Sequence, residues 1–204
     1  MVNDILKISF TILLSFYASI GHSTKILIPM DENKQKNHLK AYGIAYWILQ
    51  NEIEVEWLLN YRGGSFLVDN YSSIQEECTI RGVSYELISN AKVNKIKVEI
   101  SNPEVNQEIV KLEKAPSIAV YTPKGKQPWD DAVTLVLTYA EIPYDEIYDK
   151  EIIQNELIKY EWLHLHHEDF TGQYGKFYRN YRNAAWYIQK QKDAEASARE
   201  LGFN

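Results

Sequence analysis

The chain has 204 residues, of which 45% are hydrophobic and 13% aromatic, and its formal net charge is −6. This composition can build a real hydrophobic core in one sizeable domain or two small ones. A mildly acidic chain is not expected to bind nucleic acid, because phosphates require clustered lysine and arginine. The single cysteine, Cys78, excludes an internal disulfide. Beside Glu76 and Glu77 it is expected to be a buried structural thiol and not a nucleophile.

Residues 1–23 have the pattern of a signal peptide. Lys7 precedes an almost entirely apolar run over 8–20, and small residues for cleavage follow it. The run is shorter than the ~20 residues that cross a bilayer, and no cysteine follows to accept a lipid. We therefore expect a periplasmic or secreted protein with no stable membrane span after cleavage. Asp4 weakens the positive start of the segment, so a buried helix and an uncleaved anchor remain as alternatives.

The first half of the mature chain alternates extended and helical patterns. The helix over 37–50 stands between strands at 25–30 and 55–59, which predicts a β-α-β unit and hence a parallel strand pair. Residues 91–100 mix both periods and predict neither state. The remaining elements expected here are a strand at 66–68, a helix from 73 to 82, an extended run over 83–88, and a helix that begins at Asn102-Pro103 and carries Val105, Ile109 and Leu112.

Two adjacent glycines come shortly after the strand pattern at 55–59. Arg62, Gly63 and Gly64 follow the strand at 55–59 directly. Glycines in such a place either bring backbone close to a ligand or make a tight turn. The first interpretation predicts a ligand-binding loop with Arg62 as the charged donor. The second, a turn into the next strand, is favoured because a lone Gly-Gly pair is a weak signal.

The second half has the clearest α/β pattern, with strands at 117–121 and 144–148 around a helix at 130–141. A helix over 176–201 comes last, and because such helices normally lead back into a strand, we expect 24–204 to be an α/β domain truncated at its carboxyl end. The predicted fold is a three-layer, open, mainly parallel sheet with helices on both faces.

Residues 159–175 hold the densest group of side chains that could bind a ligand or catalyse a reaction. Read as a strand, this stretch places Trp162, His164 and His166 on one face, with Glu168 and Asp169 just past the strand end. Ligands bind at the carboxyl ends of strands in open α/β sheets. The sequence therefore predicts a site here.

Three interpretations of this site remain open. His164 and His166 can share a metal ion if Glu168, Asp169 or His38 completes the shell. Alternatively, His166 or His167 acts as a base that Glu168 or Asp169 orients. The third interpretation is a set of structural histidines bonded to backbone carbonyls. The glycine-bordered loop at 171–175, with Tyr174, could cover a ligand.

Several segments together resemble exported bacterial proteins labelled asparagine synthetase B. The match covers most of the mature chain, and the segments that carry it are 25–31 (KILIPMD), 37–43 (NHLKAYG), 57–65 (WLLNYRGGS), 121–129 (YTPKGKQPW) and 163–175 (LHLHHEDFTGQYG).

This resemblance implies a class I glutamine amidotransferase-like, flavodoxin-like fold, in a family about twice this length whose members continue into a segment with a cysteine. The label also implies cytosolic asparagine synthesis as a third possibility. The residues do not favour it, because position 2 is Val2 and not the nucleophilic cysteine, and the segment 62–66 only superficially echoes an ATP pyrophosphate loop. The expected function is hydrolysis or amide chemistry on a small polar substrate, with no cofactor indicated. The alternative is a binding module for a metal, sugar or peptide without turnover.

Overall fold

The computed structural model describes residues 25–122, 132–165 and 178–203, which fall into two compact units, Met1–Ala115 and Pro116–Asn204. The predicted fold class is wrong. The chain has α/β content, but its larger sheet has five strands that all pair antiparallel, and only a separate three-stranded sheet is parallel. A mainly parallel, flavodoxin-like sheet is therefore excluded for the described chain. Each unit is described by itself.

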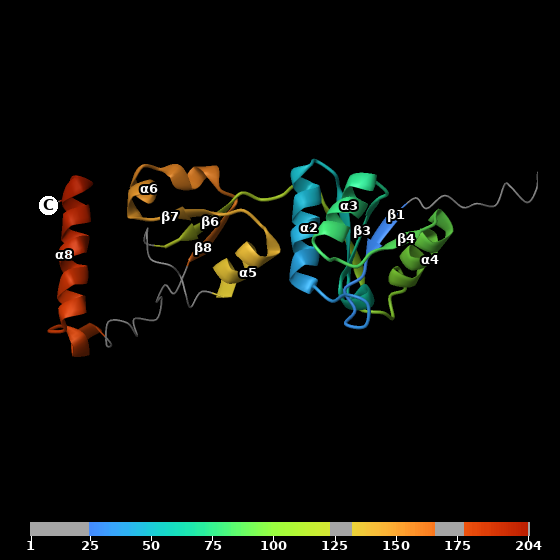
Figure 1. Cartoon of the computed structure of the whole chain (residues 1–204), viewed down its shortest axis with the longest axis horizontal. Helices are drawn as coiled ribbons and strands as arrows, with labels where there is room; N and C mark the ends of the chain where they lie inside the picture. Colours follow the sequence, from blue (N-terminus) through green and yellow to red (C-terminus); the bar gives the residue numbers. More distant parts are fainter. Residues whose placement is uncertain (1–24, 123–131, 166–177, 204) are drawn as a thin grey trace, which may run out of the picture. The chain divides into compact units, whose positions relative to one another are not determined.

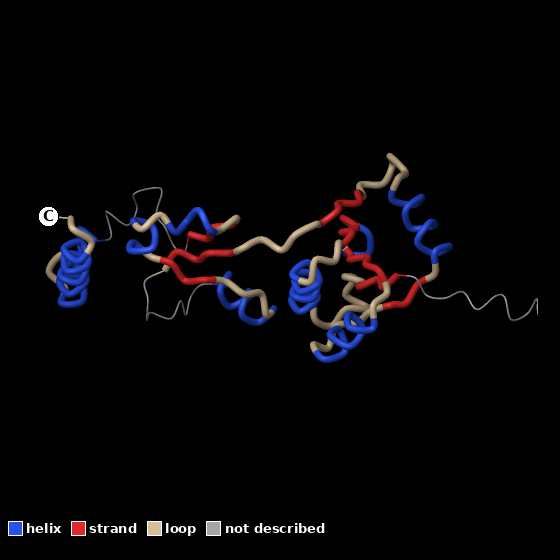
Figure 2. Tube along the Cα trace, turned by 90° about the horizontal axis from the view of Figure 1, so that it is seen from above, coloured by secondary structure: helices blue, strands red, loops and turns tan. Residues whose placement is uncertain are grey.

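The first unit is built on a split β-α-β topology. Its strand order is β4-β1-β3-β2-β5, so β3 lies between β1 and β2. In Figure 1 the labels of β3, β1 and β4 stand between those of α2 and α4, and Figure 2 colours the strands red. The first four strands have the connectivity and order of a ferredoxin-like sheet. In chain order the elements are β1 (Lys25–Ile28), α2 (His38–Gln50), β2 (Val55–Leu59), η1 (Tyr61–Gly63), β3 (Ser65–Asp69), α3 (Ser72–Ile80), β4 (Glu86–Ile88), α4 (Asn90–Ile100) and β5 (Glu108–Leu112).

The predicted parallel pairing of the strands at 25–30 and 55–59 is wrong, although both strands and the helix between them are present. The chain turns from β2 into β3 within a few residues, and so short a connection can only join antiparallel neighbours. β3 then pairs with β1 on its other side, with Leu27 opposite Leu67. The hairpin therefore separates the two strands that the helix connects.

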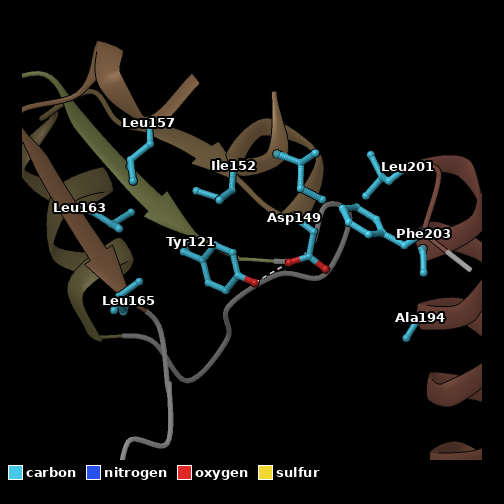
Figure 3. A pocket seen from close by; sticks show the side chains of 11 residues that line it. Tyr121, Asp149, Ile152, Leu157, Leu163, Leu165, Ala194, Leu201 and Phe203 are labelled. Atoms are coloured by element: carbon cyan, nitrogen blue, oxygen red, sulfur yellow. Dashed lines mark hydrogen bonds between the residues drawn. The ribbon is translucent and has the colours of Figure 1, made fainter. Parts of the chain in front are cut away.

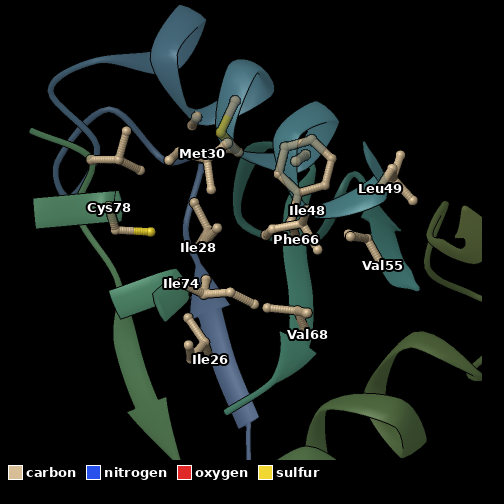
Figure 4. Packing of buried hydrophobic residues seen from close by; sticks show 14 residues of the cluster. Ile26, Ile28, Met30, Ile48, Leu49, Val55, Phe66, Val68, Ile74 and Cys78 are labelled. Carbon is tan, nitrogen blue, oxygen red and sulfur yellow. The ribbon is translucent and has the colours of Figure 1, made fainter. Parts of the chain in front are cut away.

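The two faces of this sheet bury separate apolar clusters. Ile26 and Ile28 face α2 and α3, whereas Leu27 between them faces α4, as the alternation of strand side chains requires. Figure 4 shows the larger cluster, where Phe66 lies among side chains of α2 and the sheet. Tyr42 packs edge-on against Phe66 at 5.5 Å, and Trp57 stacks at 6.1 Å between ring centroids. The sheet thus has helices against both faces, but its strands are antiparallel.

The structure decides the ambiguous stretch 91–100 and contradicts the prediction for the residues that follow Pro103. The ambiguous stretch 91–100 lies in helix α4, which buries Val93, Ile96 and Ile100. The helix predicted after Pro103 is wrong, because 108–112 form the edge strand β5. Its five residues pair with β2, and Val110 lies opposite Trp57. This sheet pairing overrides the helical spacing of the apolar residues.

The second unit contains a small parallel sheet in the order β7-β6-β8. The prediction of strands on either side of a helix over 117–148 is confirmed, with Val120 paired to Glu146. No helix of the described residues is long and apolar enough to cross a membrane. The elements of this unit are β6 (Ile118–Tyr121), α5 (Ala132–Ala140), β7 (Asp145–Ile147), α6 (Asp149–Ile153), η2 (Glu156–Lys159), β8 (Trp162–Leu165) and α8 (Ala185–Glu200).

Candidate functional site

The parallel sheet of the second unit has a topological switch point at β6. The chain passes from β6 to β7 on one side and then to β8 on the other, with all three strands parallel. Connections that leave in opposite directions open a crevice at the carboxyl ends of the strands, where ligands bind in such sheets. β6 ends at Tyr121, which is paired with Leu165 at the end of β8. These two residues mark the carboxyl-terminal edge of the sheet, formed by the ends of the strands, where a site is expected.

A pocket of about 490 Å³ lies at this edge (Figure 3). Its volume is within the range of small-molecule sites, which is roughly 300–1,000 Å³. Its wall is mainly aliphatic, and several of these side chains keep a third or more of their surface exposed, including Ile153, Leu157 and Leu165. The lining residues are Tyr121, Asp149, Ile152, Ile153, Leu157, Leu163, Leu165, Ala194, Ala198, Leu201 and Phe203.

One polar pair stands in this apolar lining. The hydroxyl of Tyr121 donates a hydrogen bond of 2.6 Å to Oδ1 of Asp149, and the ring of Tyr121 packs against Tyr148 at 5.1 Å. Both members of the pair are half-buried. The carboxylate of Asp149 makes no other hydrogen bond or ion pair within the part of the chain that the structure describes. Its second carboxylate oxygen can therefore accept a hydrogen bond from a ligand.

The residue types at this edge also explain why Tyr121 and Asp149 were missed in the sequence. Tyr121 is the last residue of β6, and Asp149 follows β7 by two positions. They therefore satisfy the rule that selected His164–Asp169, namely polar groups at the carboxyl ends of parallel strands. Applied to all three strands, and not only to the most polar one, the rule would have found both.

Of the predicted catalytic and metal residues, the structure describes His164 only. It lies in β8, half-buried and opposite Val120 in β6. His166, His167, Glu168, Asp169 and Tyr174 lie outside the described residues, so their predicted roles stay predictions. The sequence does continue directly from Leu165, a pocket residue, into His166.

Metal binding gains no support from the described residues. Within 25–122, 132–165 and 178–203, no three His, Cys, Asp or Glu side chains are grouped so that they could hold an ion. His38, the candidate that could complete the shell, belongs to the first unit, where its Nε2 lies 3.0 Å from the carbonyl oxygen of Met30. That ring nitrogen is thus engaged with backbone.

Arg62, Gly63 and Gly64 form the tight turn between β2 and β3. Arg62 has a left-handed backbone (φ 45°), and Gly63 and Gly64 continue it at 80° and 93°. A Cβ on Gly63 would stand 2.4 Å from the carbonyl oxygen of Met30. The glycine is therefore required by a close backbone approach within the unit, which confirms the interpretation as a turn.

The charge of Arg62 is also used inside this unit. Its Nε donates to Asp31 at 2.7 Å and its Nη2 to Glu86 at 2.9 Å. The hydrogen bond to Glu86 is the largest influence that raises the pKa of Arg62, burial opposes it, and Asp31 adds to it. A guanidinium held by two carboxylates is a weak candidate for binding a further anion. The ligand-binding role of Arg62 remains a prediction, and it belongs to a different unit from His164.

Cys78 is fully buried in α3, and burial is the first cause that raises the pKa of its thiol to about 12. The neighbouring Glu77 acts in the same direction. The predicted burial of Cys78 is confirmed, and a thiol with so high a pKa is a poor nucleophile at neutral pH.

Comparisons with protein-family models, with curated proteins and with solved structures found no match to this chain. The resemblance to proteins labelled asparagine synthetase B therefore rests on the sequence segments alone.

Proposed function

We propose that the second unit binds a small molecule that has an apolar part and a primary amide, at the carboxyl ends of β6 and β8. The observation that carries this proposal is the Tyr121–Asp149 pair at 2.6 Å inside an otherwise aliphatic pocket. An apolar cavity with a few convergent polar groups is the usual form of a small-ligand site. Such sites occur preferentially at switch points of parallel sheets.

The polar pair favours a ligand that donates hydrogen bonds. A carboxylate has only acceptors, so Asp149 selects an N–H or O–H group and repels another carboxylate. The hydroxyl of Tyr121 is already donated to Asp149 and keeps the carboxylate in place. The aliphatic wall from Ile152, Leu163 and Leu165 favours a ligand with an apolar portion. A primary amide on a small apolar group meets both requirements.

The proposed reaction is hydrolysis of that amide in an exported protein. The sequence leads from Leu165 in the pocket wall to His166 and His167, which are proposed as base, and to Glu168 or Asp169 as the group that orients it. This assignment agrees with the amide chemistry implied by the resemblance. Binding without turnover is the alternative, and the same pocket supports it equally.

Binding is tested with benzamide as the probe and benzoate as its matched control, since the two share a ring and differ in the donor. In titrations of the full chain we expect benzamide to bind and benzoate not to bind. Asp149→Ala should weaken benzamide binding about tenfold or more, because a hydrogen bond to a charged group contributes ~1.5–3 kcal/mol.

Asp145→Ala is the matched control variant. Asp145 accepts a hydrogen bond of 3.0 Å from the hydroxyl of Tyr160. The substitution therefore removes the same kind of tyrosine–aspartate pair, but at the amino end of β7, away from the carboxyl ends of the strands. Its benzamide affinity should equal that of the unchanged chain. Equal loss in both variants, or equal binding of benzoate, would remove the proposed site.

Turnover is tested separately by ammonia release from benzamide and from L-glutamine. His166→Ala and His167→Ala should abolish release while benzamide binding persists. Binding without any ammonia release from the unchanged chain would select the non-catalytic alternative.

A further inference from the structure

Residues 178–188, which include the start of α8, hold an exposed aromatic cluster. Ring centroids are 5.4 Å apart for Tyr178 and Tyr187, and 5.9 Å apart for Tyr181 and Trp186. Tyr181 and Trp186 still expose 45% and 48% of their surface, and Ile188 exposes 43%. Large apolar side chains exposed side by side mark an interaction surface, not a core.

The same segment is locally basic in an acidic chain. Residues 178–192 carry four cations and no carboxylate, whereas the whole chain has a net charge of −6. Arg179, Arg182 and Lys192 are exposed and make no ion pair with the residues that the structure describes. Their charge is therefore available to an anionic partner.

The fourth cation is less available. Nζ of Lys190 donates to the hydroxyl of Tyr178 at 3.0 Å, and Lys190 lines a cleft together with Asp149, Glu151 and Asp193. These carboxylates offset its charge. Three cations, Arg179, Arg182 and Lys192, therefore remain without an ion pair among the described residues.

We propose that residues 178–192 dock on the surface of an anionic phospholipid membrane. Trp and Tyr rings place an apolar body at the acyl boundary and a polar edge at the headgroups, and Lys and Arg beside them attract anionic lipid. Ile188 adds an aliphatic group that gains nothing from a nucleic acid. Three unpaired cations are also too few for the phosphate track of a polynucleotide on a chain that is negative elsewhere. This surface lies on the membrane and does not span it.

The proposal is tested by sedimenting the full chain with vesicles of phosphatidylglycerol and, in parallel, of phosphatidylcholine. We expect binding to the anionic vesicles only, and loss of that binding as added salt shortens the range of the electrostatic attraction. Arg179→Gln with Arg182→Gln should weaken binding on the order of 30-fold, since each cation near the surface contributes about fivefold.

Lys92→Gln with Lys95→Gln is the matched control, because it removes the same charge from two exposed positions of α4 in the other unit. It should leave vesicle binding unchanged. For the rings, Trp186→Ala should cost about tenfold and Trp186→Phe much less, at an unchanged unfolding midpoint. Equal losses from the two charge variants, equal binding to phosphatidylcholine, or tighter binding to a single-stranded oligonucleotide than to vesicles would overturn the proposal.

Discussion

Replacement of Gly63 by alanine should destabilise the first unit far more than the same replacement at Gly82. Both glycines have left-handed backbones, with φ of 80° and 68°. A Cβ on Gly63 would lie 2.4 Å from the carbonyl oxygen of Met30 and 2.7 Å from its carbonyl carbon, whereas a Cβ on Gly82 meets nothing within 4 Å. The two substitutions therefore share the backbone cost and differ in the overlap.

The overlap at Gly63 cannot be relieved cheaply. The amide of Met30 donates to the carbonyl oxygen of Arg62 at 3.1 Å, and the Met30 oxygen contacts His38, so the backbone on that side is held. An L-residue in the left-handed region costs ~1–2 kcal/mol. Forcing a methyl group into filled space adds about 1–3 kcal/mol. We expect a loss of about 3–4 kcal/mol for Gly63→Ala and about 1 kcal/mol for Gly82→Ala.

The assay uses Cys78, the only cysteine of the chain and a fully buried residue of the first unit. A brief exposure to a thiol reagent at increasing urea concentration labels only molecules in which this unit has opened. The midpoint then reports the stability of the unit that contains both glycines. If Gly63→Ala and Gly82→Ala shift the midpoint equally, the close approach to Met30 is not what requires glycine in the turn.

Three further predictions concern the same unit. Gln35→Ala should lower the free energy of unfolding by about 2–3 kcal/mol, because the buried Gln35 amide donates to the carbonyl oxygens of Pro29 and Ser84, which lose these bonds. Gln75→Ala should cost well under half of that in the same labelling assay, because the Gln75 amide donates only to the side chain of Asn70. Arg62→Ala should cost about 1–2 kcal/mol in the urea midpoint, and Arg62→Lys should recover less than half, since an ammonium cannot reach both carboxylates as the guanidinium fork does; full recovery by lysine would contradict this geometry. Burial raises the pKa of the Cys78 thiol from 9.0 to about 12, so the unfolded chain loses this proton at a lower pH than the folded chain. The free energy of unfolding should therefore fall between pH 9 and pH 12, by about 1.4 kcal/mol at about pH 10, in urea titrations followed by tryptophan fluorescence. If a Cys78→Ala chain shows the same fall with pH, the thiol is not the cause of the fall.

Local patterns predicted most strands and helices but not the sheet pairing of the first unit. Strand periodicity says which residues face a core, and it does not say which strand is the neighbour. The helix between 25–30 and 55–59 suggested a parallel pair, yet the short link through Arg62, Gly63 and Gly64 already required an antiparallel hairpin. Read as a hairpin signal, that turn would have corrected the topology.

The strand pairing of the second unit was easier to predict, because no hairpin strand comes between the two strands of its β-α-β pattern. The strand at 162–165 was also found, and its parallel pairing with β6 follows the expected direction. The sequence did not reveal the pocket. His164 stood out by composition, but β8 lines the pocket with Leu163 and Leu165, which lie on the other face of the strand, and Tyr121 and Asp149 are ordinary residues. Tyr121 and Asp149 are 28 positions apart in the sequence. They meet because β6 ends at Tyr121 and α6 begins at Asp149, just after the end of β7.

The most direct test of the proposed function is to locate bound benzamide by nuclear Overhauser effects between its ring protons and the methyl groups of the full chain. We expect contacts with Ile152 of α6 and with Leu163 and Leu165 of β8, which line the pocket, and loss of these contacts in Asp149→Ala. Contacts with methyl groups of the first unit, such as Val98 on the exposed face of α4, or no contacts at all, would contradict it.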